Sequence, residues 1–210
     1  MYEYNRYGEI MKSILVEMTC PTCSYHTHIP SDTVIIPEFE PDLKKRLQQG
    51  TFYSYVCPCC HTKIHFFHTC IYPDKEHGFV LMMKTKKERQ FYDHSFYENK
   101  GFVRRYIGSE DAIAEKINIL EGMFDDRVIE IMKVKLYLHF LKQGRKIASI
   151  RYHDYEQGSF WFCIQEDEQP QLVAINKADY DDIKTTLKDI VTEQFEEIDL
   201  NWAIEYLKKV

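Results

Sequence analysis

The sequence predicts an α+β protein: an N-terminal zinc ribbon of two β-hairpins with an inserted short helix, then a helix-rich lobe with a small antiparallel sheet. Two Cys-Pro-x-Cys tetrapeptides lie 33 residues apart, and residues of β-type alternation flank each of them. Apolar residues at helical spacing follow residue 109, and three short strand patterns lie between residues 147 and 176. We therefore expect a zinc-ribbon-like domain over residues 1–105 and a helical lobe with a three-stranded sheet over residues 106–210.

The first hairpin is predicted around Cys20 and Cys23. Ile14, Val16 and Met18 alternate with their neighbours, which indicates a strand that runs into Cys20. A second strand is expected at Tyr25–Ile29. The tip of this hairpin would carry the first cysteine pair.

The second hairpin repeats this arrangement. Residues Thr51–Val56 lead into Cys57, and Thr62–His68 follow Cys60. Between the hairpins, Pro41 favours the first turn of a short helix, and Gly50 can end it with a left-handed conformation.

The second lobe should begin with two helices. Ser109 is a candidate N-cap for the first, and Asp125 is a candidate N-cap for the second, which runs to Gly144. The second helix is apolar on several sides, so we expect neighbours to bury it on more than one face. Further expected elements are a strand at Gly78–Met83, a meander of three strands and two final helices. The meander strands are Ile147–Tyr152, Phe160–Gln165 and Leu172–Asn176, and the helices are Asp179–Gln194 and Asn201–Lys209.

The two cysteine pairs predict one structural zinc ion with the ligands Cys20, Cys23, Cys57 and Cys60. Zinc in structural sites is bound by four ligands in a tetrahedron, and a C-x2-C turn places two sulfurs on one side of the ion. Proline suits the second position of each turn because the amides that donate to the first sulfur come from later residues. Cys59 competes with Cys60 as a ligand in the second loop, although it would shorten the loop by one residue.

Two alternatives use the same region. A redox Cys-x-x-Cys would need no metal, but this motif normally stands alone on a βαβ scaffold. Seven of the nine histidines lie between residues 26 and 94, and His65, His68 and Cys70 could form a second metal site. On a strand, His65 and His68 would point to opposite faces, so surface or supporting roles are the simpler interpretation.

Composition limits the classes of function. The net charge is −6, and the excess of acidic residues lies in residues 101–210, which argues against a protein that binds nucleic acid mainly through phosphates. The N-terminus has no cationic start with an apolar run, and no stretch approaches the roughly 20 apolar residues that span a bilayer. We expect a cytoplasmic protein without a membrane segment, in which reduced cysteines serve as metal ligands and core residues.

The duplicated Cys-Pro-x-Cys, the Pro41–Leu47 helix and the Phe52–Cys57 strand together resemble the bacterial CpXC family. The resemblance covers roughly residues 12–85, and the stretch Leu120–Glu130 is similar to a helical extension that many members carry. The family has no established activity, so the resemblance implies a fold and a metal and no reaction.

Three functions remain. The first is a zinc-stabilised interaction or scaffold module for a protein partner. The second is nucleic-acid binding or a transcription-associated accessory role, because cations and aromatic residues alternate between residues 84 and 106. The cations are Lys84, Lys86, Lys87, Arg89, Arg104 and Arg105, and the aromatic residues are Phe91, Tyr92, Phe96, Tyr97, Phe102 and Tyr106.

The third function is an enzyme. The sequence contains no phosphate-binding loop, no nucleophile elbow and no H-E-x-x-H motif. The adjacent pairs Asp93–His94 and His153–Asp154 are most simply surface residues. The sequence thus favours a protein without enzymatic activity and names no catalytic residue.

Overall fold

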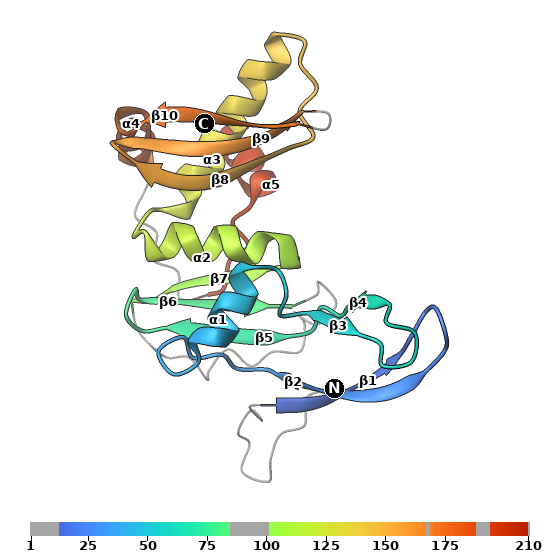
Figure 1. Cartoon of the computed structure of the whole chain (residues 1–210). Helices are drawn as coiled ribbons and strands as arrows, with labels where there is room; N and C mark the ends of the chain where they lie inside the picture. Colours follow the sequence, from blue (N-terminus) through green and yellow to red (C-terminus); the bar gives the residue numbers. More distant parts are fainter. Residues whose placement is uncertain (1–12, 85–100, 167–168, 188–193, 210) are drawn as a thin grey trace. The chain divides into compact units, whose positions relative to one another are not determined.

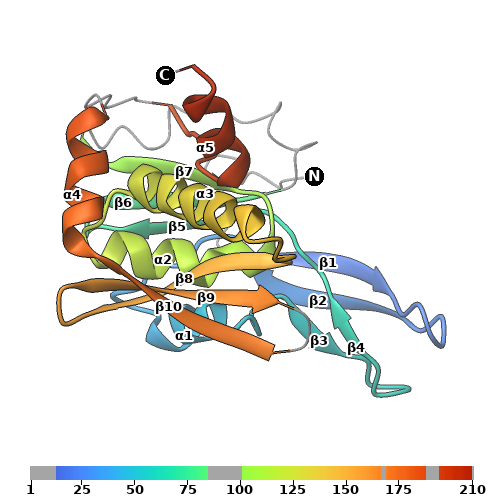
Figure 2. The same cartoon turned by 90° about the horizontal axis from the view of Figure 1, so that it is seen from above.

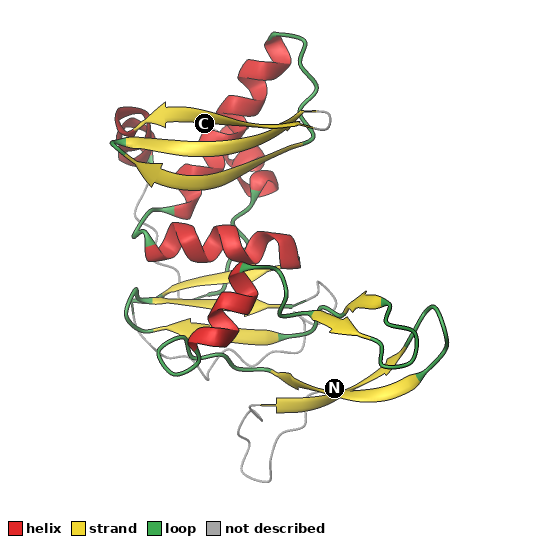
Figure 3. Cartoon of the chain, in the orientation of Figure 1, coloured by secondary structure: helices red, strands yellow, loops and turns green. Residues whose placement is uncertain are grey.

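The structure is a computed structural model of the whole chain, and it describes residues 13–84, 101–166, 169–187 and 194–209 (Figure 1). The chain forms two compact units. Unit 1 comprises Met1–Ala114 with Thr192–Glu196, and unit 2 comprises Glu115–Val191 with Glu197–Val210. The α+β class is confirmed, since helices and small sheets occur together (Figure 3). The predicted boundary at residue 105 stays a prediction.

Unit 1 contains the two predicted hairpins. In the first, β1 (Ser13–Thr19) pairs antiparallel with β2 (His26–Asp32). In the second, β3 (Ser54–Val56) pairs antiparallel with β4 (Lys63–His65). The tips of both hairpins lie at the same end of the unit (Figures 1 and 2).

The predicted short helix lies between the hairpins as α1 (Pro41–Gln48). Pro41 occupies the first turn, and Gly50 has a φ of +63° beyond the C-terminus, as expected. Leu47 is fully buried, so the helix is held by packing of this residue against the rest of the unit.

A second sheet of unit 1 was only partly predicted. Its strand order is β5-β6-β7, with β5 (Cys70–Asp74), β6 (Phe79–Met83) and β7 (Val103–Ile107). Only β6 had been expected. β5 pairs antiparallel with β6, whereas β7 pairs parallel with it. Short bridges extend the sheet beyond both edge strands, since Val34 pairs with Ile71 and Glu196 pairs with Arg105.

Unit 2 is built around α3 (Asp126–Lys142). The helix before it is α2 (Ile113–Glu121), whose first two residues belong to unit 1. The three-stranded meander is confirmed, with the order β10-β9-β8 (Figure 3). Its strands are β8 (Ser149–Glu156), β9 (Ser159–Glu166) and β10 (Gln169–Asn176). Phe160, Phe162 and Ile164 of β9 are fully buried against α3 in one hydrophobic core.

The two final helices, α4 (Lys177–Thr186) and α5 (Leu200–Leu207), also pack on α3 (Figure 2). Burial of α3 on more than one face is therefore confirmed. The predicted helix Asp179–Gln194 was too long, because Leu187 is already extended, with a ψ of 128°. Of the predicted N-caps, Asp125 accepts a hydrogen bond from the Arg127 amide, whereas the Ser109 side chain makes no cap hydrogen bond.

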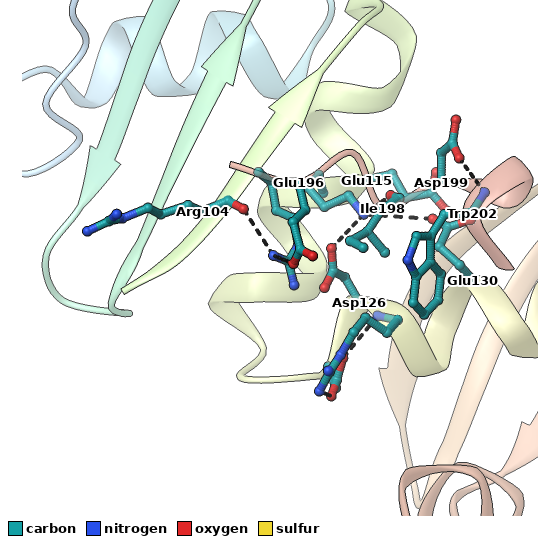
Figure 4. Close-up of polar contacts among 12 residues, drawn as sticks. Arg104, Glu115, Asp126, Glu130, Glu196, Ile198, Asp199 and Trp202 are labelled. Atoms are coloured by element: carbon teal, nitrogen blue, oxygen red, sulfur yellow. Dashed lines mark hydrogen bonds and ion pairs between the residues drawn. The ribbon is translucent and has the colours of Figure 1, made fainter. Parts of the chain in front are cut away.

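A cluster of charged side chains lies inside unit 2. Lys116 Nζ lies 2.8 Å from Asp126 Oδ2 and donates a hydrogen bond of 2.7 Å to the carbonyl of Ile198 (Figure 4). Lys133 Nζ contacts Glu115 at 3.0 Å and Glu130 at 2.9 Å. Because buried charges are costly unless they are paired, these contacts fix α2, α3 and the segment before α5 relative to one another.

Within the described residues, no helix is both long and apolar enough to cross a membrane.

Candidate metal centre

Four cysteines from the two hairpin tips meet in unit 1. The Sγ atoms of Cys20, Cys23, Cys57 and Cys60 all lie within 4.8 Å of one another. The cross-hairpin distances are 3.5 Å between Cys20 and Cys60 and 3.7 Å between Cys23 and Cys57. The four residues selected from the sequence are thus brought together, each hairpin contributing two.

The same backbone hydrogen bonds shape both loops. The amide of Ser24 donates to the carbonyl of Cys20, and the amide of His61 donates to the carbonyl of Cys57, both at 2.9 Å. Each first cysteine in turn donates from its amide to a carbonyl five residues later, Cys20 to Tyr25 and Cys57 to Thr62. Both tips are therefore copies of one tight turn.

Amide groups also point at the sulfurs. Hydrogen bonds from the amides of Cys23 and Thr22 lower the pKa of Cys20, although burial opposes them. The Thr62 hydroxyl, 3.2 Å from the sulfur, and the Thr62 amide lower the pKa of Cys60 to about 6. These donors come from residues after each proline, as predicted, so the missing N–H of proline leaves no sulfur without a donor.

The pKa of Cys23 reflects the close approach of the four thiols. The Tyr25 amide favours its thiolate, but burial and contacts with the other three sulfurs outweigh this, and the pKa of Cys23 is raised. Ionisation of all four thiols at once needs a nearby positive charge. A divalent cation supplies that charge, because a coordinated thiol is deprotonated outright.

The other cysteines lie outside this group. Cys59, the rival ligand, is exposed, whereas Cys20 and Cys57 are each 1% exposed. Cys70 is fully buried in β5, and burial raises its pKa. All seven cysteines are free thiols.

The histidines of the proposed second site have separate partners. His65 Nδ1 lies 3.2 Å from a carboxylate oxygen of Glu110 on the surface. His68 is buried, and its two ring nitrogens contact Ser31 and the carbonyl of Thr69. These contacts agree with supporting rather than ligating roles for both residues. His94 lies outside the described residues.

Residues 84–106 were considered for nucleic-acid binding, and the cations of this segment that the structure describes are buried. Lys84 is fully buried, and Arg104 and Arg105 are each 7% exposed. The remaining cations, Lys86, Lys87 and Arg89, lie outside the described residues, as do Phe91, Tyr92, Phe96 and Tyr97. His153 and Asp154 are exposed on β8, as expected of surface residues, while Asp93 lies outside the described part.

The fold and this cluster define a protein whose first unit is organised around paired cysteine loops. The profile of the CpXC protein family matches residues 18–133, which include both loops, α1, the second sheet, α2 and half of α3. The chain belongs to the CpXC family, and the resemblance drawn from the sequence is confirmed. No curated protein and no solved structure matches the chain.

Proposed function

We propose that Cys20, Cys23, Cys57 and Cys60 bind one zinc ion that joins the two hairpins in a zinc ribbon. The supporting observation is the spacing of the sulfurs. A tetrahedron with Zn–S bonds of about 2.3 Å has S–S edges of about 3.8 Å. The distances of 3.5 and 3.7 Å across the hairpins are close to this value.

The proposed role of the ion is structural. Four cysteine ligands fill the tetrahedron and leave no position for water or substrate, so the metal would not act as a catalyst. Structural zinc contributes about 10–16 kcal/mol of apparent binding energy in zinc-finger peptides. Energy of this size would stabilise the second hairpin above all, because its strands β3 and β4 have only three residues each.

We further propose that the protein is an interaction or scaffold module for a protein partner. Large apolar side chains on unit 1 are exposed: Leu15 is 71%, Phe39 81% and Val56 55% exposed. A partner that covered these side chains would remove apolar surface from water, which favours association. The burial of Lys84, Arg104 and Arg105 makes nucleic-acid binding the weaker alternative.

A thiol redox role is a further alternative. A disulfide requires about 2.05 Å between sulfurs and would join cysteines in one loop for a redox Cys-x-x-Cys. Instead, the short contacts cross from one hairpin to the other at 3.5 and 3.7 Å. This arrangement suits a shared ion better, and reduced thiolate ligands suit the cytoplasm, which we propose as the compartment.

Native mass spectrometry of protein purified without added metal tests the metal proposal. We expect one zinc ion per chain with all seven cysteines reduced. X-ray absorption at the zinc edge should then show four sulfur neighbours at about 2.3 Å. Metal-free protein with two disulfides would refute the proposal and favour redox chemistry.

A further inference from the structure

A small cavity lies in unit 1, away from the cysteine cluster. It has a volume of about 110 Å³ and is lined by β1, β2, α1, β3, the segment before β3 and the segment after β4. Ser31, Arg46 and His68 are among its lining residues. None of the four clustered cysteines lines it.

Ser31 and His68 are hydrogen-bonded to each other at this cavity. Ser31 Oγ contacts His68 Nε2, and His68 Nδ1 lies 2.9 Å from the carbonyl oxygen of Thr69. A carbonyl can only accept, so Nδ1 carries the proton in the neutral ring. Nε2 is then the acceptor, and the Ser31 hydroxyl must donate to it.

Aromatic rings hold the His68 imidazole in place. Its centroid lies 5.0 Å from that of Tyr53 in an edge-on arrangement and 6.0 Å from that of Phe52. The Phe66 ring stacks at 6.2 Å. The ring orientation and the tautomer are both fixed before any ligand arrives, which is the preorganisation that a general base requires.

We propose that Ser31 is a nucleophile and His68 its general base, in a site that hydrolyses small esters. The arrangement has the parts of a serine–histidine pair: a hydroxyl that donates to a base, and a third group that orients the base. Here the Thr69 carbonyl orients the base. The volume of about 110 Å³ is well below the roughly 300–1,000 Å³ of drug-sized ligand sites, so the site would accept a short acyl group.

The reaction would proceed in two steps, acylation of Ser31 and hydrolysis of the acyl-serine. Ser31 Oγ bonds to the ester carbonyl carbon while His68 Nε2 takes the hydroxyl proton. The carbon–oxygen bond to the alcohol then breaks, and the alcohol leaves with that proton. Water, deprotonated by Nε2, attacks the acyl-serine, releases the carboxylic acid and restores Ser31.

Arg46 supplies positive charge to the same cavity. Its Nη2 donates to the carbonyl of Phe52 at 3.2 Å, and its guanidinium lies 5.6 Å from the Phe52 ring centroid. A guanidinium has five N–H donors, so others can serve a ligand. We assign Arg46 to the negative charge that develops on the carbonyl oxygen.

Covalent labelling of the full-length, metal-replete protein tests the proposal. An ethoxy fluorophosphonate should add once, with loss of fluoride, and peptide mass spectrometry should place the adduct on Ser31. Ser31→Ala should abolish this adduct. His68→Gln should slow labelling about 100-fold, the size expected for removal of a general base. Release of p-nitrophenol from p-nitrophenyl acetate should fall in both variants.

Ser109→Ala is the matched control. Ser109 is exposed, its side chain makes no cap hydrogen bond, and it does not line the cavity. Labelling should be unchanged in this variant.

Melting temperature and zinc content identify any variant that fails to fold, and Ser31→Cys then provides a second test. The thiol introduced by this substitution should react with iodoacetamide faster than the exposed Cys59, because His68 would favour its thiolate. An unlabelled Ser31 in folded protein, or equal labelling of folded His68→Gln, would mean a purely structural hydrogen bond and overturn the proposal, whatever the metal content.

Discussion

Ser24 and His61 adopt the same left-handed backbone conformation, with φ angles of 57° and 59°, directly after the second cysteine of each loop. The two loops therefore share their turn geometry as well as their cysteine spacing. Glycine is the residue that adopts this conformation without steric cost, and neither loop has it.

Glycine at these two positions should stabilise the protein. A left-handed residue with a side chain costs about 1–2 kcal/mol, and the greater freedom of glycine in the unfolded chain offsets part of that. We expect Ser24→Gly and His61→Gly each to add about 0.5–1 kcal/mol to the free energy of unfolding, measured by urea denaturation. Lys63→Gly, at an exposed strand position nearby, should lower it instead. Equal destabilisation by all three would show that the loops are unstrained.

Cysteine substitutions should distinguish the four clustered cysteines from Cys59 as zinc ligands. Cys57→Ser should abolish stoichiometric zinc binding and lower the melting temperature, because three sulfurs leave the tetrahedron incomplete. Cys59→Ser is the control, since Cys59 is exposed and outside the cluster, and it should retain one zinc ion. Zinc content is measured by native mass spectrometry. Loss of zinc in Cys59→Ser alone would reassign the ligand set.

Removal of Lys116 should destabilise unit 2 strongly. Lys116→Met leaves the buried Asp126 carboxylate without its 2.8 Å partner, and breaking such a pair costs about 3–5 kcal/mol. Adding Asp126→Asn to this variant should recover part of the loss. Lys177→Met breaks an exposed pair with Asp181 and should cost about 1 kcal/mol or less. Similar losses for the two lysines, measured by denaturation, would contradict a buried network.

The pH dependence of the free energy of unfolding should reveal the raised pKa of Glu130. Burial raises the pKa of Glu130 above its usual 4.5, and the contacts with Lys116 and Lys133 only partly oppose this. Between 4.5 and the raised value the folded state binds more protons than the unfolded state, so this residue makes stability fall as pH rises through that window. Glu130→Gln should remove this decline, measured as melting temperature against pH.

Glu205 provides the comparison of opposite sign. Its pKa is lowered by Lys208, so its contribution to stability is present above its unfolded pKa and disappears as pH falls through the lowered one. Glu205→Gln should therefore leave the decline above pH 4.5 intact. An identical pH profile for wild type and Glu130→Gln would exclude a raised pKa.

The hairpins and their cysteine tips could be predicted because both signals are local: the Cys-Pro-x-Cys spacing and the alternation of residues such as Val16 and Met18. β5 and β7 could not be predicted from such local signals. All five residues of β5 are buried, so it shows no alternation, and Pro73 argues against a strand. β7, the parallel partner of β6, begins only at Val103, and pairing of strands so far apart in the sequence leaves no local signal.

The cavity was missed for a related reason. Ser31 and His68 are 37 residues apart and meet only through tertiary packing. The sequence drew attention to His68 as a metal ligand because it lies near His65 and Cys70. Its partner Ser31 carried no signal, since an isolated serine at the end of a strand pattern has no characteristic spacing.

The bridge from Glu196 to β7 has a consequence for biosynthesis. The amide of Tyr106 donates to the Glu196 carbonyl at 2.8 Å, and the Glu196 amide donates to the Arg104 carbonyl at 3.3 Å. A chain is synthesised from its N-terminus, so residues 115–191 of unit 2 are made before this last piece of unit 1. Until then β7 lacks that neighbour, and a polypeptide truncated at Ala114 would keep an open sheet edge able to pair with other chains.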